Sequence, residues 1–124
     1  MNVVDSSGWL EYFADGPNAA QFAKAIEATS KLVVPTLSIF EVFKRVMVQR
    51  GEDAALEAAA LMRQGRVVPL DDALALEAAR LSVTERLALA DSIILATARA
   101  HKATLWTQDA DFRNVHGVRY LPKS

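Results

Sequence analysis

Short apolar segments alternate with amphipathic helical segments along almost the whole chain, and this alternation constrains the fold more than any other feature. The apolar segments predict strands at residues 2–5, 31–35, 66–70, 103–107 and 118–121. Apolar residues spaced three and four apart predict helices at residues 6–14, 19–28, 36–50, 52–64, 71–83 and 89–102, and residues 108–114 read as a polar turn or short helix. Strands that alternate with helices pair in parallel through right-handed crossovers. The sequence therefore predicts one α/β domain over residues 1–124, a three-layer α/β/α doubly wound fold with a mainly parallel sheet of about five strands.

Two details of this pattern are specific enough to test. Pro69 places the strand at 66–70 at an edge of the sheet or marks its end, because proline lacks the N–H that an interior strand needs. The helix at 36–50 carries an apolar stripe of Leu37, Phe40, Phe43 and Met47. This stripe is expected to pack into the core or to form a partner surface.

Composition excludes several kinds of site and partner. The chain has no cysteine and two histidines, which excludes thiolate zinc and cysteine nucleophiles and argues against a multi-histidine metal site. A net charge of -1 makes no case for nucleic acid on charge alone. No uncharged segment exceeds nine residues, and the N-terminus lacks the basic and apolar regions of a signal peptide. We expect a cytoplasmic protein with no membrane partner.

Acidic residues follow the predicted strands. Asp5 ends the first strand, Glu41 lies in the first two turns of the helix after the second strand, and Asp109 and Asp111 follow the strand that ends at Thr107. In doubly wound sheets, ligands bind beyond the carboxyl ends of the strands. Several carboxylates at one edge repel each other unless a cation lies between them, and oxygen-only sites favour magnesium or manganese.

Asp91 is unusual because it lies on an apolar stripe with Leu87, Ile94 and Leu95. A carboxylate there requires a partner, and a divalent cation is one such partner. On topology alone, we expect Asp91 to reach the acidic edge only if its helix runs in an unusual direction.

Each acid also has a purely structural interpretation. Asp5 and Asp91 suit the N-cap positions of helices starting near Ser6 and Ser92, and Ser38 with Glu41 matches the S-x-x-E capping box. Aspartates such as Asp109 are common in turns.

Four segments of the chain resemble PIN domains, specifically the VapC-type toxin ribonucleases. They are VVDSS at 3–7, SIFEV at 38–42, LADSIILATA at 89–98 and LWTQDADF at 105–112. Their order and spacing match over essentially the whole chain, although Trp106 stands where the family more often has a smaller aliphatic residue.

The resemblance implies a magnesium-dependent ribonuclease toxin, with manganese as an alternative ion, that leaves a 5′-phosphate and a 3′-hydroxyl. By motif position, the catalytic and metal-binding residues would be Asp5, Glu41, Asp91 and Asp109. Ser6, Thr107 and Asp111 would be auxiliary, the first two holding carboxylates by hydrogen bonds. The resemblance also implies that the helix carrying Asp91 presents its N-terminal part to the site.

The same resemblance implies RNA as substrate, a cognate VapB-type antitoxin and a homodimer. RNA needs a basic rim around the acids, for which the candidates by sequence proximity are Lys44, Arg45, Arg86, Arg99 and Arg113. One alternative is a PIN-fold protein that binds RNA or antitoxin without cleavage. Another is a receiver-like phosphoacceptor domain, which needs two adjacent acids after the first strand, where this chain has Asp5-Ser6-Ser7.

Overall fold

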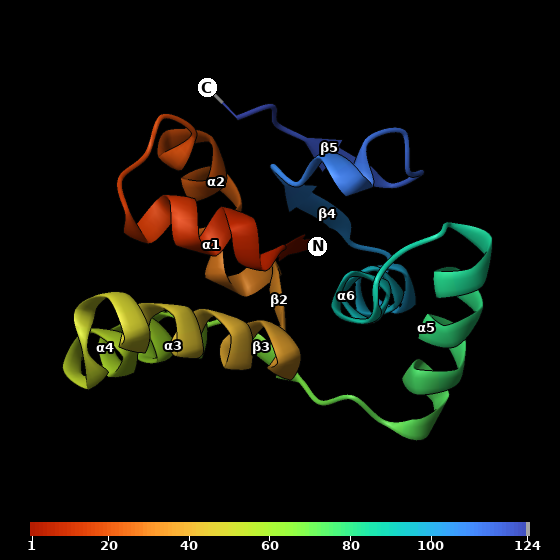
Figure 1. Ribbon diagram of the computed structural model, residues 1–124, viewed down its shortest axis with the longest axis horizontal. Coiled ribbons are helices and arrows are strands. Elements are labelled where there is room, and N and C mark those ends of the chain that lie inside the picture. The colour runs from red at the N-terminus through yellow and green to blue at the C-terminus, as the bar shows by residue number, and fades with distance from the viewer. Residues whose placement is uncertain (124) are drawn as a thin grey trace.

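Five parallel strands form one sheet in the computed structural model, which describes residues 1–123 (Figure 1). The strands are β1 (Asn2–Val4), β2 (Leu32–Pro35), β3 (Arg66–Val68), β4 (Thr104–Thr107) and β5 (Val118–Tyr120). The helices are α1 (Ser6–Phe13), α2 (Ala19–Ile26), α3 (Thr36–Arg50), α4 (Glu52–Met62), α5 (Asp72–Thr84) and α6 (Leu89–Ala100). Two short 3₁₀ helices, η1 (Thr29–Lys31) and η2 (Ala110–Phe112), complete the elements. All predicted strands and helices are confirmed, with small shifts at their ends. The structure adds η1, which the pattern did not predict.

The strand order is β3-β2-β1-β4-β5, and every neighbouring pair is parallel. β3 is an edge strand that ends at Val68, as Pro69 predicts. The order differs from the 2-1-3-4-5 order of flavodoxin-like sheets, to which receiver domains belong. The topology therefore excludes the receiver-like alternative.

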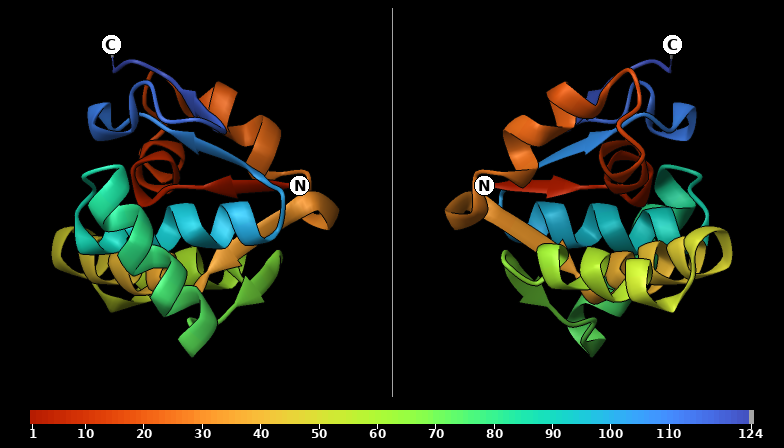
Figure 2. Two further views of the ribbon diagram at one scale, coloured as in Figure 1. Left: turned by 90° about the vertical axis from the view of Figure 1, so that its right-hand side faces the viewer. Right: turned by 90° about the vertical axis from the view of Figure 1, so that its left-hand side faces the viewer.

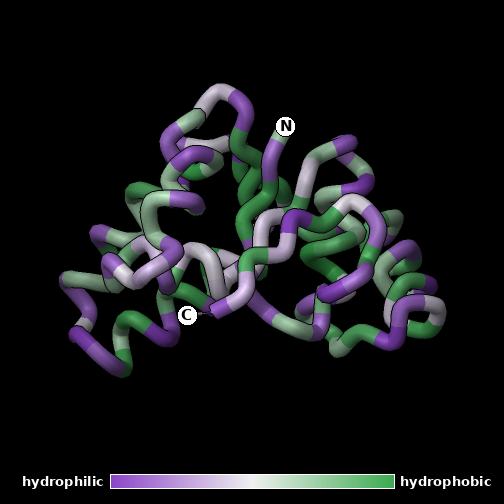
Figure 3. The backbone as a smooth tube through the Cα atoms, turned by 90° about the horizontal axis from the view of Figure 1, so that it is seen from above, coloured by the Kyte–Doolittle hydropathy of each residue, from purple (hydrophilic) through white to green (hydrophobic). Residues whose placement is uncertain are grey.

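Helices cover both faces of the sheet, which confirms the three-layer α/β/α fold (Figures 1 and 2). Side chains alternate along each strand, so that Val3 and Leu105 join a core beneath α5 and α6. Val4 and Trp106 point the other way, into a core shared with α1 to α4. Figure 3 shows the apolar strands in the middle of the molecule. Within residues 1–123, no helix combines the length and the apolar character needed to cross a membrane.

The apolar stripe predicted for α3 divides between core and surface, because Leu37 and Phe43 are partly buried against the two cores while Phe40 and Met47 are exposed. The buried residues of α3 are Ser38, Val42 and Val46, whereas Phe40 is 61% exposed and Met47 is 43% exposed. The helix is therefore rotated relative to the prediction, and a small serine occupies a core position at 0% exposure. The rotation turns Phe40 toward solvent beside Glu41.

Candidate functional site

The point where the strand order reverses lies between β1 and β4. Chain order proceeds from β1 through β2 to β3 on one side, and from β4 to β5 on the other. Crossovers leave in opposite directions at such a point and open a crevice at the carboxyl ends of the two strands. Asp5 directly follows β1, and Asp109 lies two residues after β4. The topology thus brings two of the predicted acids to the expected binding crevice.

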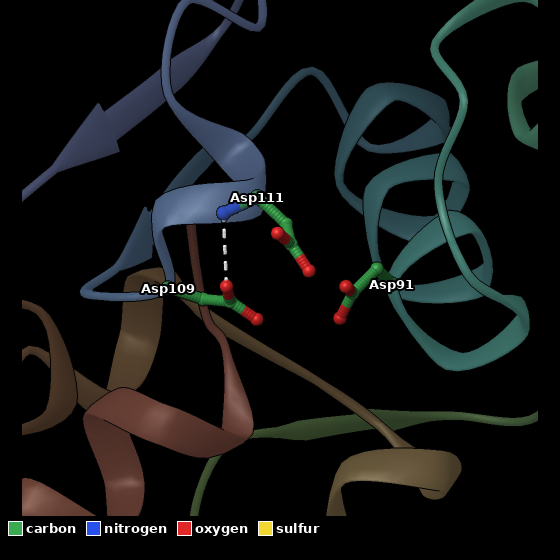
Figure 4. A group of neighbouring side chains, drawn as sticks. All are labelled: Asp91, Asp109 and Asp111. Atoms are coloured by element: carbon green, nitrogen blue, oxygen red, sulfur yellow. Dashed lines mark hydrogen bonds between the residues drawn. The ribbon is translucent and has the colours of Figure 1, made fainter.

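Three carboxylates gather near the carboxyl end of β4. Asp91, Asp109 and Asp111 each offer an oxygen, and these oxygens all lie within 4.8 Å of one another. Figure 4 shows Asp91 on α6 facing the other two across a gap. The backbone N–H of Asp111 donates to Oδ1 of Asp109 at 2.9 Å, so Asp109 also acts as the cap of η2. The structure therefore places Asp111, the auxiliary acid that the family resemblance implies, inside this group.

Asp91 reaches the crevice because α6 runs antiparallel to the strands. A short turn joins the end of α6 to the start of β4, so the first turn of α6 lies near the end of β4. This is the ordinary direction of a crossover helix, and the expectation that an unusual direction would be needed was wrong. The N-cap interpretation of Asp91 is also wrong, because α6 begins at Leu89 with Ala88 as its N-cap.

Asp5 is buried and firmly oriented. Its Oδ2 accepts hydrogen bonds from Oγ of Ser7 at 2.7 Å and from Oγ1 of Thr107 at 2.9 Å. The N–H of Ser7 also donates to this oxygen at 3.4 Å, so Asp5 is the N-cap of α1 as well. Burial raises the pKa of Asp5 against the lowering effect of these bonds, and the charge of Asp109 raises it further.

Glu41 is held by the hydroxyl of Ser6, which donates to its Oε1 at 2.6 Å. The capping-box interpretation is wrong, because α3 begins at Thr36 and Ser38 is buried inside the helix. Ser6 and Thr107 thus hydrogen-bond to carboxylates as predicted, one to Glu41 and the other to Asp5. Ser7 is a further donor that the sequence analysis missed, and its position two residues after an N-cap aspartate is the signal that identifies it.

The pKa of Asp91 responds to its burial and to the four other acids. Burial raises the pKa of Asp91 from 3.8 to about 7, and nearby negative charges add to the shift. The contributing neighbours are Asp5, Asp109, Asp111 and Glu41. Asp5 and Glu41 nevertheless lie outside the group of three whose oxygens meet within 4.8 Å.

The donor set fits a hard divalent cation. It consists of carboxylate oxygens alone, the class of ligand that magnesium and manganese prefer. Within residues 1–123, the two ion pairs join Arg80 to Glu77 and Arg99 to Glu85, and none of the five acids takes part. A cation between the carboxylates would remove the repulsion that raises the pKa of Asp91.

The predicted basic residues separate into two groups. Lys44 and Arg45 line a pocket that also contains Ser6 and Glu41. The other three do not line this pocket. Arg86 is exposed in the α5–α6 loop, and Arg113 lies over the ring of Tyr120. Arg99 pairs with Glu85 and donates a hydrogen bond to the carbonyl of His116.

Gln108 is a residue that sequence analysis passed over. It is buried directly after β4, and its Oε1 accepts a hydrogen bond from Asn18 at 3.1 Å. Its backbone N–H donates to Oγ of Ser7 at 3.2 Å, which connects the end of β4 to the donors of Asp5. A glutamine between a threonine and an aspartate carries no sequence signal of its own.

Comparison with known proteins agrees with this architecture. The model of the family described as "PIN domain" matches residues 3–118. A toxin–antitoxin complex from Klebsiella pneumoniae contains a similar chain, with 22% identity, full coverage of both chains and a TM-score of 0.83. The VapC20 toxin of Mycobacterium tuberculosis, described as cleaving the sarcin-ricin loop, is 18% identical over 94% of this chain and 95% of its own, with a TM-score of 0.77.

A third similar structure is VapBC2 from Rickettsia felis bound to a DNA fragment from its promoter. It is 9% identical over 98% of this chain and 97% of its own, with a TM-score of 0.75. At these identities, the three structures support the fold. No curated protein matches the chain in sequence.

Proposed function

Because this chain belongs to the PIN-domain family, we propose that it is a metal-dependent ribonuclease of the VapC type that hydrolyses RNA phosphodiester bonds. The observation that carries the proposal is the convergence of Asp91, Asp109 and Asp111 at the crevice between β1 and β4. Asp5 and Glu41 flank this group closely enough to raise the pKa of Asp91. Magnesium is the proposed ion, and manganese is the alternative.

The acids have different proposed roles because their surroundings differ. Asp5 and Asp91 are the principal ligands, with Asp109 and Glu41 completing the set and Asp111 adding a further oxygen. Ser7 and Thr107 fix the orientation of Asp5, and Ser6 fixes that of Glu41. Asp91 must lose its proton to act as a ligand, and its raised pKa makes proton and cation compete for it.

The proposed reaction is attack of water on the scissile phosphorus. Held by these carboxylates, a divalent ion would lower the pKa of a water molecule and stabilise charge on the phosphoryl oxygens. A carboxylate of the group accepts the proton as water attacks. The water oxygen bonds to phosphorus as the P–O3′ bond breaks, and the leaving 3′-oxygen takes a proton from solvent. The products therefore carry a 5′-phosphate and a 3′-hydroxyl, and no 2′,3′-cyclic phosphate forms because the RNA 2′-hydroxyl is not the nucleophile.

The proposal extends to the protein partners and the compartment. Similar chains occur in structures of toxin–antitoxin complexes, which supports a cognate VapB-type antitoxin as the partner. We further propose that residues 1–124 act as one PIN domain, that the chain forms a homodimer and that it works in the cytoplasm.

The test is cleavage of total cellular RNA by antitoxin-free protein, with magnesium or with EDTA. The wild-type chain is compared with Asp5→Asn and Asp91→Asn, and circular dichroism verifies that each variant folds. We expect cleavage by the wild-type chain alone and only with magnesium. Cleavage of equal extent by the folded variants would show a contaminating nuclease and refute the assignment of these acids.

A further inference from the structure

A groove leaves the acidic site along the exposed face of α3. Two pockets, of about 570 and 350 Å³, form it, and both are lined by Leu10, Arg45 and Gln49. The first pocket includes the Ser6–Glu41 pair, and the second extends to Arg50 and Lys123. The groove thus begins at the acidic site and runs toward the end of α3.

The groove is basic where the site is acidic. Lys44, Arg45, Arg50 and Lys123 line it, and none of them forms an ion pair within residues 1–123. The lining acids are Glu41, which accepts from Ser6, and Glu11. Glu11 is already engaged, because its Oε2 accepts from the N–H of Asn18 at 2.8 Å and its Oε1 from Nε2 of Gln108 at 3.5 Å.

Phe40 provides an exposed aromatic ring at the end of the groove nearest the acids. The residue is 61% exposed, immediately precedes Glu41 and lines the same pocket. Nζ of Lys44 lies 5.9 Å from the centroid of its ring. A ring with a cation beside it suits a ligand that combines a flat base with a phosphate.

We propose that this groove binds the single-stranded RNA segment on one side of the scissile phosphate, with Phe40 stacking on a base and Lys44 and Arg45 contacting phosphates. The inference rests on the proposed ribonuclease function and adds the path and strand state of its substrate.

Charge and continuity favour RNA as the occupant. Four cations face one groove on a chain whose net charge is -1, so the positive charge is concentrated locally. From Phe40 to Arg50, α3 rises about 15 Å at about 1.5 Å per residue, enough for two or more nucleotides of a strand that advances at least about 3.4 Å per nucleotide. The groove also reaches Glu41, one of the five acids, so a strand lying in it would lead toward the site.

The test measures binding of a 12-nucleotide, fluorescein-labelled single-stranded RNA of mixed sequence by anisotropy at several salt concentrations. Every protein carries Asp91→Asn so that the probe is not cut. Lys44→Gln, Arg45→Gln and Arg45→Lys probe the phosphate contacts. Lys31→Gln is the matched control, because Lys31 is exposed just before β2, at the amino ends of the strands and away from the acids at their carboxyl ends.

We expect Lys44→Gln and Arg45→Gln each to reduce the slope of log affinity against log salt by about 0.7, the value for one phosphate contact on a single strand. Arg45→Lys and Lys31→Gln should keep the slope. Equal slopes for Arg45→Gln and Lys31→Gln would overturn the proposal.

Phe40 is tested by Phe40→Leu, which keeps an apolar side chain without a flat ring, and by Phe40→Trp. We expect Phe40→Leu to weaken RNA binding about 5- to 150-fold and Phe40→Trp to retain it. Equal binding by Phe40→Leu and the parent would refute stacking. A labelled decaglutamate peptide tests whether the groove instead binds an acidic segment of a protein partner. If Arg45→Gln loses binding of this peptide but keeps binding of RNA, the groove serves a protein partner and the proposal is wrong.

Cleavage of total RNA with magnesium, in chains that retain Asp91, distinguishes this inference from the proposed function. If the wild-type chain binds RNA through the groove but never cleaves it, the proposed ribonuclease activity is refuted and the proposed RNA-binding groove stands. A wild-type chain that cleaves, with Arg45→Gln and Phe40→Leu cleaving equally well, would refute the groove alone.

Discussion

Replacing Asp91 with asparagine should stabilise the metal-free protein at neutral pH. The pKa of Asp91 rises from 3.8 to about 7 on folding, so the unfolded chain releases this proton at lower pH than the folded chain does. Stability from this group is therefore full below about pH 4 and is lost as pH rises to about 7. This rise in pKa corresponds to about 4 kcal/mol of unfolding free energy. Because Asp91 is only partly buried, screening by water reduces the expected effect on stability to about 1–2 kcal/mol.

The assay is thermal unfolding in EDTA from pH 3 to pH 8. For a chain of this length, we expect Asp91→Asn to melt about 4–8 °C above the wild-type protein at pH 7.5, and we expect the difference to disappear near pH 3, below the unfolded-state pKa of 3.8. Asp15→Asn is the control, because Asp15 is exposed in the turn after α1 and asparagine tolerates its positive φ of 52°. Added magnesium should raise the melting temperature of the wild-type protein more than that of Asp91→Asn. If metal-free Asp91→Asn melts at or below the wild-type protein at pH 7.5, the burial and repulsion of the Asp91 carboxylate do not destabilise the folded protein.

Three further changes test the supports of the site and the fold. Thr107→Val removes a donor from Asp5 and should weaken magnesium binding about 10- to 100-fold, measured by calorimetry; unchanged affinity would show that Ser7 alone orients Asp5. Gly8→Ala places a Cβ 2.6 Å from the ring of Phe22 and should lower stability by about 1–3 kcal/mol in denaturant unfolding, and an unchanged midpoint would mean that the ring moves freely aside. Asp71→Ala removes the N-cap of α5 and should cost about 1 kcal/mol while RNA cleavage stays at the wild-type level, so a loss of cleavage in the folded variant would contradict a purely structural role.

The fold could be predicted from the sequence because each strand and helix carries a local signal. Leu32 to Val34 is a continuous apolar run bounded by polar and proline residues, and β2 forms there with its residues buried. The rotation of α3 could not be predicted in the same way. Its apolar residues occur on more than one side, and the side that packs is chosen by α1, α4 and the sheet, not by local spacing. The spacing of Phe40 is compatible with a core position or a surface position, and only the packing of α3 against its neighbours leaves it exposed.

The sequence predicts those acids of the site that directly follow a strand, because strand ends can themselves be predicted. Asp5 follows β1 and Asp109 follows β4, and the parallel pairing of these strands brings both acids to the same end of the sheet. Gln108, Arg50 and Lys123 were missed because each joins its surroundings through contacts across the fold. Spacing along the chain contains no information about such contacts.

The contrast between Asp5 and Asp91 explains how the fold tolerates so many acids at one edge. Asp5 is the more deeply buried of the two, yet three donors converge on its Oδ2 and hold it. Within residues 1–123, the Asp91 carboxylate accepts no side-chain or backbone hydrogen bond, and it faces Asp109 and Asp111. The cost of burial and repulsion thus falls on one carboxylate without hydrogen-bond donors, at the start of α6. Binding of a cation would release its free energy chiefly there, while the buried partner stays in place.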